Sequence, residues 1–436
     1  MKRLIHYINT EVLVKAARLN NANITLKIVT GILISKFIAL YIGPYGMALI
    51  GNLRNFMSAI QSLAIAGLYK GVVKFINETK NNALELSKTL STVFYFGFFS
   101  SMLLAFLCYY NAEFINNLIF TSNYNYTYII KVMATVLPFY ALNMFVFSIM
   151  NGFSKHKILL IINIIGQVLG LLVTLVLIKQ ENIDGALMAI VITPTLNLLI
   201  SVVGILYRKN LVSYVKISNV SFSVLDKLSP YMIMALVSSI AIPIVTLIIR
   251  SYIIDEVGIK EAGYWEAMNR VSNYYLMFIN SLMALYILPR FTQINTKKAF
   301  RKEVFSFYKT IIPIFGVLLL VIYFTRSFLV PLLFTEEFRP VETLFGYQIL
   351  GDFVRVLSMV IAYQFLAKKM FSHFIVLEIF LFVMLYVSSI YLIDDFGYKG
   401  AVMAHCFSYV MYFGLILLIF GSSLFGVLED QSTKDS

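Results

Sequence analysis

Long apolar stretches separated by short polar segments run along this chain from about residue 22 to residue 421. An α-helix needs about 20 apolar residues to cross the hydrocarbon core of a bilayer. The pattern therefore predicts twelve transmembrane helices, at residues 22–42, 46–69, 89–111, 127–150, 157–178, 184–207, 228–254, 262–289, 303–325, 341–367, 370–393 and 399–421. Gly43 and Pro44 separate the first two spans, because Gly-Pro breaks a helix.

The composition supports this class. Hydrophobic residues make up 60% of the 436 residues and charged residues only 13%, whereas a soluble domain has about 25% charged residues. We therefore expect an all-α polytopic membrane protein. Its first residues lack the features of a cleavable secretory signal. A net charge of +13 can indicate nucleic-acid binding. Here most basic residues lie in the segments between the predicted helices, so we expect no nucleic-acid partner.

Most of the 35 lysines and arginines lie in alternate inter-helix segments on the side of the N-terminus. Basic residues are enriched in cytoplasmic loops, so both termini are expected in the cytoplasm. We expect an N-terminal six-helix bundle (residues 1–207), a cytoplasmic linker (208–227), a C-terminal six-helix bundle (228–424) and a cytoplasmic tail (425–436). A weak internal repeat supports two halves, because Gly46 precedes Arg54 much as Gly263 precedes Arg270. No loop is long enough for a catalytic domain.

Six charged residues lie inside the predicted spans: Lys36, Arg54, Arg270, Asp352, Arg355 and Glu378. A charge at mid-membrane costs a few kcal/mol or more, so such residues usually face a polar pathway. Four of the six are cationic, which indicates a path for an anion. By their depth in the predicted spans, Lys36, Arg54 and Arg270 lie in the outer half of the membrane. Arg355 lies nearer the midplane. Such a cluster would attract phosphate strongly.

Each charge also has a structural interpretation. Lys27 and Arg250 lie close to span ends, where they either snorkel to the surface or join the cavity. Lys27 and Lys36 are nine residues apart and point to opposite faces of a straight helix, so we favour Lys36. Asp352 and Arg355 form either a structural or a functional pair at i and i+3. Glu378 is either a protonated, hydrogen-bonded group or, with Asp352, an ion-coupling residue.

Other chemistry is sparse. Cys108 and Cys406 fall within spans, so neither a disulfide nor a metal site is expected, and the four histidines are dispersed. Polar residues within spans include four amides that either hydrogen-bond between helices or contact sugar hydroxyls: Asn143, Asn163, Gln167 and Gln364.

Several stretches resemble a known family: LKIVTGILISKFIALYIGP with GNLRNF, AGLYKGVVKF, YWEAMNRVSNYYLMFINSLMALYILPRFTQI and FGYQILGDFVRVLSMVIAYQFLAKK. The chain resembles, over most of its length, the Wzx-type lipid-linked oligosaccharide flippases of the multidrug/oligosaccharidyl-lipid/polysaccharide (MOP) exporter superfamily. This group includes O-antigen and enterobacterial common antigen (lipid III) flippases.

The resemblance implies two six-helix bundles arranged as a V around a central cavity. The implied substrate is an undecaprenyl-pyrophosphate-linked oligosaccharide, flipped from the cytoplasmic to the periplasmic leaflet of the bacterial inner membrane in lipopolysaccharide or polysaccharide biosynthesis. The family's cationic positions match five residues of this chain: Lys27, Lys36, Arg54, Arg250 and Arg355. The acidic residue of the family's Gly-Asp pair matches Asp352. Arg270 departs from the family, where a small polar residue is expected.

This assignment predicts a transporter and not an enzyme. We expect no cofactor. The sequence motifs include no ATP site, so a proton or a sodium ion is the candidate coupling ion. Expected partners are the lipid-linked glycan, membrane lipids and other glycan-assembly proteins such as a polymerase or chain-length regulator, and the chain is expected to be a monomer. The alternative is a multidrug or cation exporter of the same superfamily. Such an exporter should carry acidic residues in its first span, where this chain has Lys27 and Lys36.

Overall fold

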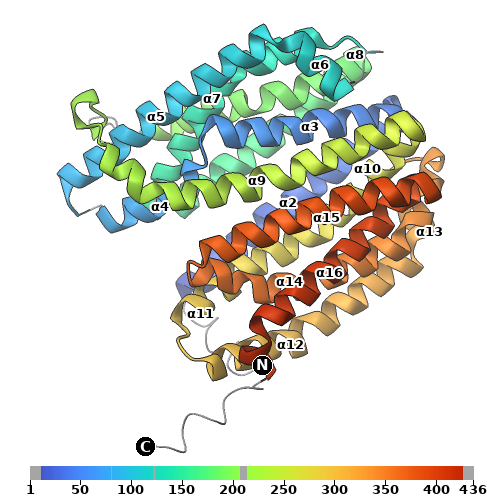
Figure 1. Ribbon diagram of the computed structural model, residues 1–436. Helices are drawn as coiled ribbons and strands as arrows, with labels where there is room; N and C mark the ends of the chain where they lie inside the picture. Colours follow the sequence, from blue (N-terminus) through green and yellow to red (C-terminus); the bar gives the residue numbers. More distant parts are fainter. Residues whose placement is uncertain (1–10, 80, 121–123, 207–213, 426–436) are drawn as a thin grey trace, which may run out of the picture. The chain divides into compact units, whose positions relative to one another are not determined.

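The computed structural model describes residues 11–79, 81–120, 124–206 and 214–425, and these ranges contain helices and no strand (Figure 1). The first half forms α2 (Glu11–Tyr41), α3 (Pro44–Ala64), α4 (Leu68–Thr79), α5 (Ala83–Tyr110), α6 (Ala112–Phe120), α7 (Thr127–Gly152), α8 (His156–Leu206) and the short turn η2 (Ile217–Asn219). The second forms α9 (Phe222–Glu256), α10 (Ile259–Leu282), η3 (Met283–Ile287), α11 (Leu288–Gln293), α12 (Lys297–Phe324), α13 (Arg326–Leu333), η4 (Glu336–Leu344), α14 (Phe345–Ala367), α15 (Phe371–Phe396) and α16 (Tyr398–Phe425).

Within the described residues, ten helical segments are long and apolar enough to cross a membrane. The all-α, polytopic membrane class is therefore confirmed, while the number of twelve spans stays a prediction. One of the ten segments, His156–Val202, covers the predicted span at 157–178 and most of the one at 184–207. Its backbone is interrupted at Asn182, which has a φ of 49° and a ψ of −119°. We call residues 156–181 and 183–206 the first and second arms of α8, and they match the predicted spans at 157–178 and 184–207.

The break predicted after the first span is also present. Gly43 has a φ of 84° before Pro44, which begins α3. The second helix ends at Ala64 and not at residue 69, because Ala66 and Gly67 adopt left-handed conformations with φ of 48° and 65°. A new, amphipathic helix, α4, then begins at Leu68.

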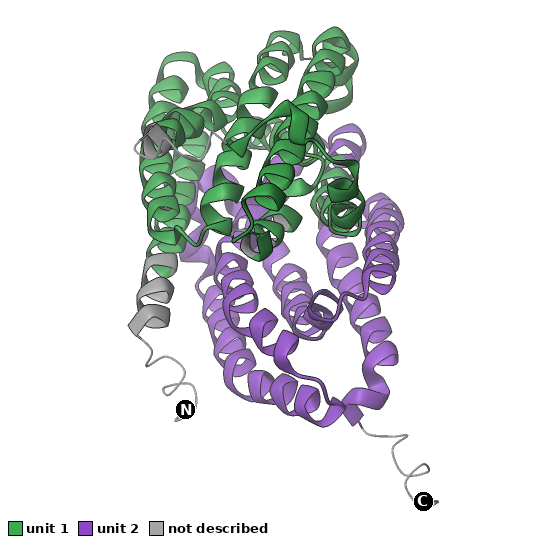
Figure 2. Ribbon diagram, turned by 90° about the vertical axis from the view of Figure 1, so that its left-hand side faces the viewer, with its two compact units in different colours: residues 1–247 green, residues 248–436 purple. Residues whose placement is uncertain are grey.

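The chain folds into two compact units, Met1–Leu247 and Ile248–Ser436, which we call unit 1 and unit 2 (Figure 2). In unit 1, α7 packs against α5 and α8, and α2 packs against α8. In unit 2, α16 packs against α14 and α15, and α14 also contacts α10, α11 and α12. The boundary between the units lies inside α9, whereas the sequence placed it at 208–227; the predicted domain limits stay predictions. Residues 208–213 and 426–436 of the predicted linker and tail lie outside the described residues.

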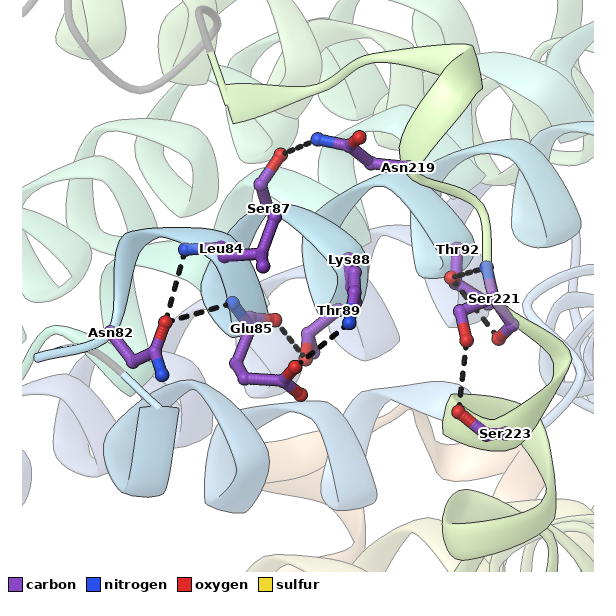
Figure 3. Close-up of polar contacts among 10 residues, drawn as sticks. All are labelled: Asn82, Leu84, Glu85, Ser87, Lys88, Thr89, Thr92, Asn219, Ser221 and Ser223. Carbon is purple, nitrogen blue, oxygen red and sulfur yellow. Dashed lines mark hydrogen bonds and ion pairs between the residues drawn. The ribbon is translucent and has the colours of Figure 1, made fainter.

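Hydrogen bonds connect the described part of the predicted linker to α5 (Figure 3). Asn82 caps α5 by accepting hydrogen bonds from the N–H groups of its first turn. One turn further on, Ser87 Oγ donates to the carbonyl of Tyr214 at 2.6 Å and accepts from Asn219 Nδ2 at 2.7 Å. Hydroxyls of α5 thus satisfy backbone and side-chain groups that a segment without regular structure leaves unpaired. The residues before α9 are therefore part of unit 1's packed structure.

Two glycines at equivalent positions reveal a repeat between the units. A Cβ on Gly185 would lie 2.0 Å from the carbonyl oxygen of Leu177, and one on Gly400 would lie 2.0 Å from that of Leu392. The two glycines and the two leucines are separated by the same number of residues, and the sequences that follow read GALMA and GAVMA. Gly185 and Leu177 lie at the turn between the two arms of α8, and Gly400 and Leu392 lie at the turn between α15 and α16. This repeat is stronger than the predicted one between the Arg54 and Arg270 regions, because it joins identical residues with the same close contact.

We predict that Gly185→Ala and Gly400→Ala each destabilise the protein by about 1–3 kcal/mol, because the added methyl group forces a backbone carbonyl to move. Thermal unfolding of the purified protein in detergent measures the effect. Gly414→Ala is the matched control, since a Cβ there meets nothing within 4 Å. Equal melting temperatures for the three variants would contradict the argument.

Candidate functional site

A cavity of about 540 Å³ lies within unit 1 between α2, α3 and α8. It is lined by two cationic side chains, four carboxamides, three threonines, two glycines and three aliphatic residues: Lys27, Arg54, Asn23, Asn163, Gln167, Asn197, Thr30, Thr174, Thr193, Gly166, Gly170, Ile34, Leu171 and Ile190. The described residues of this lining include no carboxylate. The cavity therefore combines positive charge with neutral hydrogen-bonding groups.

Helical periodicity explains which residues line the cavity. On α2 they recur from Asn23 through Lys27 and Thr30 to Ile34 at spacings of three or four residues, which places them on one helix face. The first arm of α8 repeats this spacing between Asn163 and Thr174. These amides and threonines are a polar stripe on otherwise apolar helices, a sequence signal that the search for charges alone overlooked.

The structure places Lys27, and not Lys36, in this cavity. Both Lys27 and Arg54 line it with exposed side chains. Lys36 is half-buried and is not among the lining residues, as its position on the opposite helix face predicts. Two of the predicted cations, Lys27 and Arg54, are thus brought together with two of the predicted sugar-contacting amides, Asn163 and Gln167.

The other two predicted sugar-contacting amides lie elsewhere. Asn143 is buried on α7 and accepts a hydrogen bond from Ser201 Oγ at 2.7 Å, which favours a structural role in this conformation. Gln364 is half-buried on α14 in unit 2.

Asp352 is the centre of a polar cluster in unit 2. Its side chain is fully buried, and its two oxygens receive hydrogen bonds from α10, α14 and α16. The donors are Ser272 Oγ at 2.6 Å, Tyr275 Oη at 2.5 Å and Gln348 Nε2 at 3.1 Å, while His405 Nε2 lies 3.0 Å from Oδ1. This number of partners compensates for burial of a carboxylate.

The backbone of α14 makes this cluster possible. A Cβ on Gly351 would lie 2.6 Å from His405 Cδ2, so the glycine lets α16 approach closely. Arg355, predicted to pair with Asp352, places its guanidinium 5.4 Å from the centre of the Tyr409 ring. Glu378 is half-buried on α15. The charge of Asp352 is visible in the sequence, whereas His405 lies on a distant helix and has no local sequence signal that links it to Asp352.

Arg250 and Arg270 are held by Glu266, which was not among the predicted site residues. Arg250 Nη2 lies 2.5 Å from Glu266 Oε2, and Arg270 Nε lies 3.0 Å from Glu266 Oε1. Arg250, Arg270 and Glu266 are 0%, 3% and 5% exposed. Arg250 also lies over the ring of Trp265, at 5.4 Å from its centre. The i, i+4 spacing of Glu266 and Arg270 was the available sequence signal.

Comparison with known proteins identifies the family. The family described as polysaccharide biosynthesis protein matches residues 43–343. The chain belongs to this family. The lipid III flippases of Escherichia coli (strain K12) and Shigella flexneri are each 27% identical to it over 411 residues, covering 94% of this chain and 98% of theirs.

Solved structures show the fold that this family member shares. An inward-facing multidrug resistance MATE family transporter of the MOP superfamily has a TM-score of 0.74, with 13% identity over 92% of this chain and 95% of its own. The lipid II flippase MurJ, in an inward closed conformation, has a TM-score of 0.73, with 16% identity over 94% of this chain and 87% of its own. The resemblance to lipid-linked oligosaccharide flippases that the sequence indicated is confirmed by the lipid III flippases, and the solved structures show the fold.

We predict that Glu266→Gln destabilises the protein by about 3–5 kcal/mol, because it leaves two buried guanidinium groups without their shared carboxylate. Thermal unfolding in detergent measures the loss. Glu336→Gln serves as the control, because Glu336 pairs with Arg339 on the exposed surface, where ion pairs contribute little. A Glu266→Gln variant as stable as this control would overturn the structural role of the cluster.

Proposed function

We propose that this family member is a flippase that moves a polyprenyl-pyrophosphate-linked oligosaccharide from the cytoplasmic to the periplasmic leaflet of the bacterial inner membrane. The observation that carries the proposal is the unit 1 cavity, in which Lys27 and Arg54 share one space with four carboxamides. The lipid III flippases, related over nearly their whole length, support the same class of substrate. The chain acts as a transporter, so no bond needs to be made or broken.

The physical task explains this composition. A sugar-pyrophosphate headgroup loses the hydration of its charges and hydroxyls in hydrocarbon, at a prohibitive cost. Cations replace water around phosphate oxygens through charge-assisted hydrogen bonds, and carboxamides both donate to and accept from sugar hydroxyls. The polyprenyl tail has no such cost and can stay in lipid. Lys27 and Arg54 therefore take the pyrophosphate, and the amides take sugar hydroxyls.

The remaining cations serve in other steps of the cycle under this proposal. Arg250 and Arg270 are occupied by Glu266 in this conformation, and Arg355 lies over Tyr409. Together with Lys36, they are candidates to receive the pyrophosphate when alternating access changes their surroundings. The proposal keeps both termini in the cytoplasm, as the distribution of basic residues indicates, and the chain works as a monomer alongside other glycan-assembly proteins.

Coupling to an ion gradient is part of the proposal. Asp352, with Glu378 as a second candidate, exchanges a proton or sodium ion between conformations. The buried donors around Asp352 support such a role, because a carboxylate in a low-dielectric site responds strongly to the gain or loss of one cation. Neither a nucleotide nor a resident cofactor is required.

We predict that Arg54→Ala and Lys27→Ala each lower the rate of headgroup transport about tenfold or more, because a charge-assisted hydrogen bond contributes about 1.5–3 kcal/mol. The measurement is translocation of a fluorescent polyprenyl-pyrophosphate glycan in proteoliposomes. Lys131→Ala is the control, since that lysine lies on α7 near the Tyr109 ring and away from the cavity lining. Undiminished transport by both variants would refute the role of the cavity.

The same proteoliposomes test the multidrug exporter alternative. Two cations in the cavity repel a cationic drug, so the protein should not move rhodamine-type cations. Deletion of the gene should make an undecaprenyl-pyrophosphate oligosaccharide accumulate on the cytoplasmic face. Drug sensitivity without this accumulation would replace the flippase function with drug export.

A separate prediction concerns coupling. Imposed proton or sodium gradients should change the initial rate of transport by the wild-type protein, whereas Asp352→Asn should remove this dependence, because the amide cannot carry the charge that links the ion to the cycle. Glu378→Gln is measured alongside as the second candidate. A wild-type rate that ignores both gradients would exclude ion coupling.

A further inference from the structure

The two arms of α8 meet at glycines on the cavity wall. A Cβ on Gly166 would lie 2.1 Å from Asn197 Oδ1, and a Cβ on Gly170 would lie 3.2 Å from Thr193 Cγ2. All four residues line the cavity. The carboxamide of Asn197 therefore lies against the backbone of the first arm, in a space that any larger residue at 166 would occupy.

The polar groups beside Asn197 divide into two kinds. Thr174 and Thr193 donate their hydroxyl hydrogens to carbonyls of their own arms, both at 2.6 Å, so their donors are already used. Gln167 Nε2 donates to Asn23 Oδ1 at 2.7 Å, which fixes the wall of α8 relative to α2. The carboxamides, in contrast to the threonines, can offer a donor and an acceptor to one ligand.

We infer that Asn197, held against Gly166, is a specificity-determining residue that recognises the saccharide part of the headgroup and not its pyrophosphate. The inference rests on the proposed function and extends it. A carboxamide matches a pair of sugar hydroxyls, one accepting and one donating, whereas a bare pyrophosphate cannot donate to its oxygen. Sugar selectivity at Asn197 is therefore separable from the anion affinity supplied by Lys27 and Arg54.

The size of the cavity limits what is recognised. Its 540 Å³ lies within the range of about 300–1,000 Å³ typical of pockets that enclose a drug-sized ligand. That space suits a pyrophosphate with a short part of the glycan, and not a long oligosaccharide. The discrimination made by Asn197 then concerns sugars that fit beside the pyrophosphate in this space.

The test uses the full chain in lipid nanodiscs and two probes: a short-chain polyprenyl pyrophosphate and the same lipid carrying one hexose. Asn197→Ala should weaken binding of the hexose-bearing probe about 3- to 10-fold, the loss of one or two neutral hydrogen bonds, and leave the bare probe unchanged. Gly166→Ala should do the same by displacing the carboxamide. Arg54→Ala should weaken both probes.

Gly97→Ala is the matched control, because a Cβ there makes an ordinary contact of 3.8 Å with Leu68 Cδ1; it should bind both probes as the wild type does. If Gly166→Ala fails to fold, Asn197→Ala and Asn197→Ser carry the test. Asn197 variants that weaken both probes equally, or neither, overturn the inference while the proposed function stands. A wild-type protein that binds neither probe overturns both.

Discussion

The cost of placing a charge among apolar membrane helices governs the polar architecture of this protein. Such a charge must find partners inside the protein or face a polar space. Unit 2 uses the first solution: Asp352 is surrounded by four polar side chains, and Glu266 joins two arginines in a buried cluster. In unit 1, Lys27 and Arg54 line a polar cavity. One physical constraint thus gives two kinds of site.

This difference suggests a division of labour between the units. A charge cluster that is buried and internally compensated is suited to change state when one ion arrives, because the low dielectric amplifies the effect. An open cavity with cations and amides is suited to hold a polar, anionic group of limited size. The two kinds of site occur although both units carry the same glycine-closed helical turn, at Gly185 and at Gly400. A repeated fold has therefore been given different polar chemistry.

Small residues position the chemistry as much as charged ones do. Gly351 allows α16 to bring His405 to Asp352, and Gly166 allows the second arm of α8 to bring Asn197 into the cavity wall. In membrane proteins, close helix contact through small residues is a main source of packing energy. Here the same close contact also lets His405 and Asn197 approach the neighbouring helix. The positions of these polar groups therefore depend on glycines of a neighbouring helix or arm and not on their own residue type.

The sequence by itself determined the class of the protein, most of its helices and the charges that require explanation, because apolar length and intramembrane charge are local properties. It also determined that Lys27 and Lys36 face opposite sides of α2. Only the tertiary structure decided which of the two lines a cavity, since that depends on where α8 packs. It likewise decided that Asp352 meets His405 and that Arg250 shares Glu266 with Arg270. Asp352 and His405 lie on α14 and α16, and Arg250 on α9 reaches Glu266 on α10. Helix packing, which no local pattern encodes, brings these partners together.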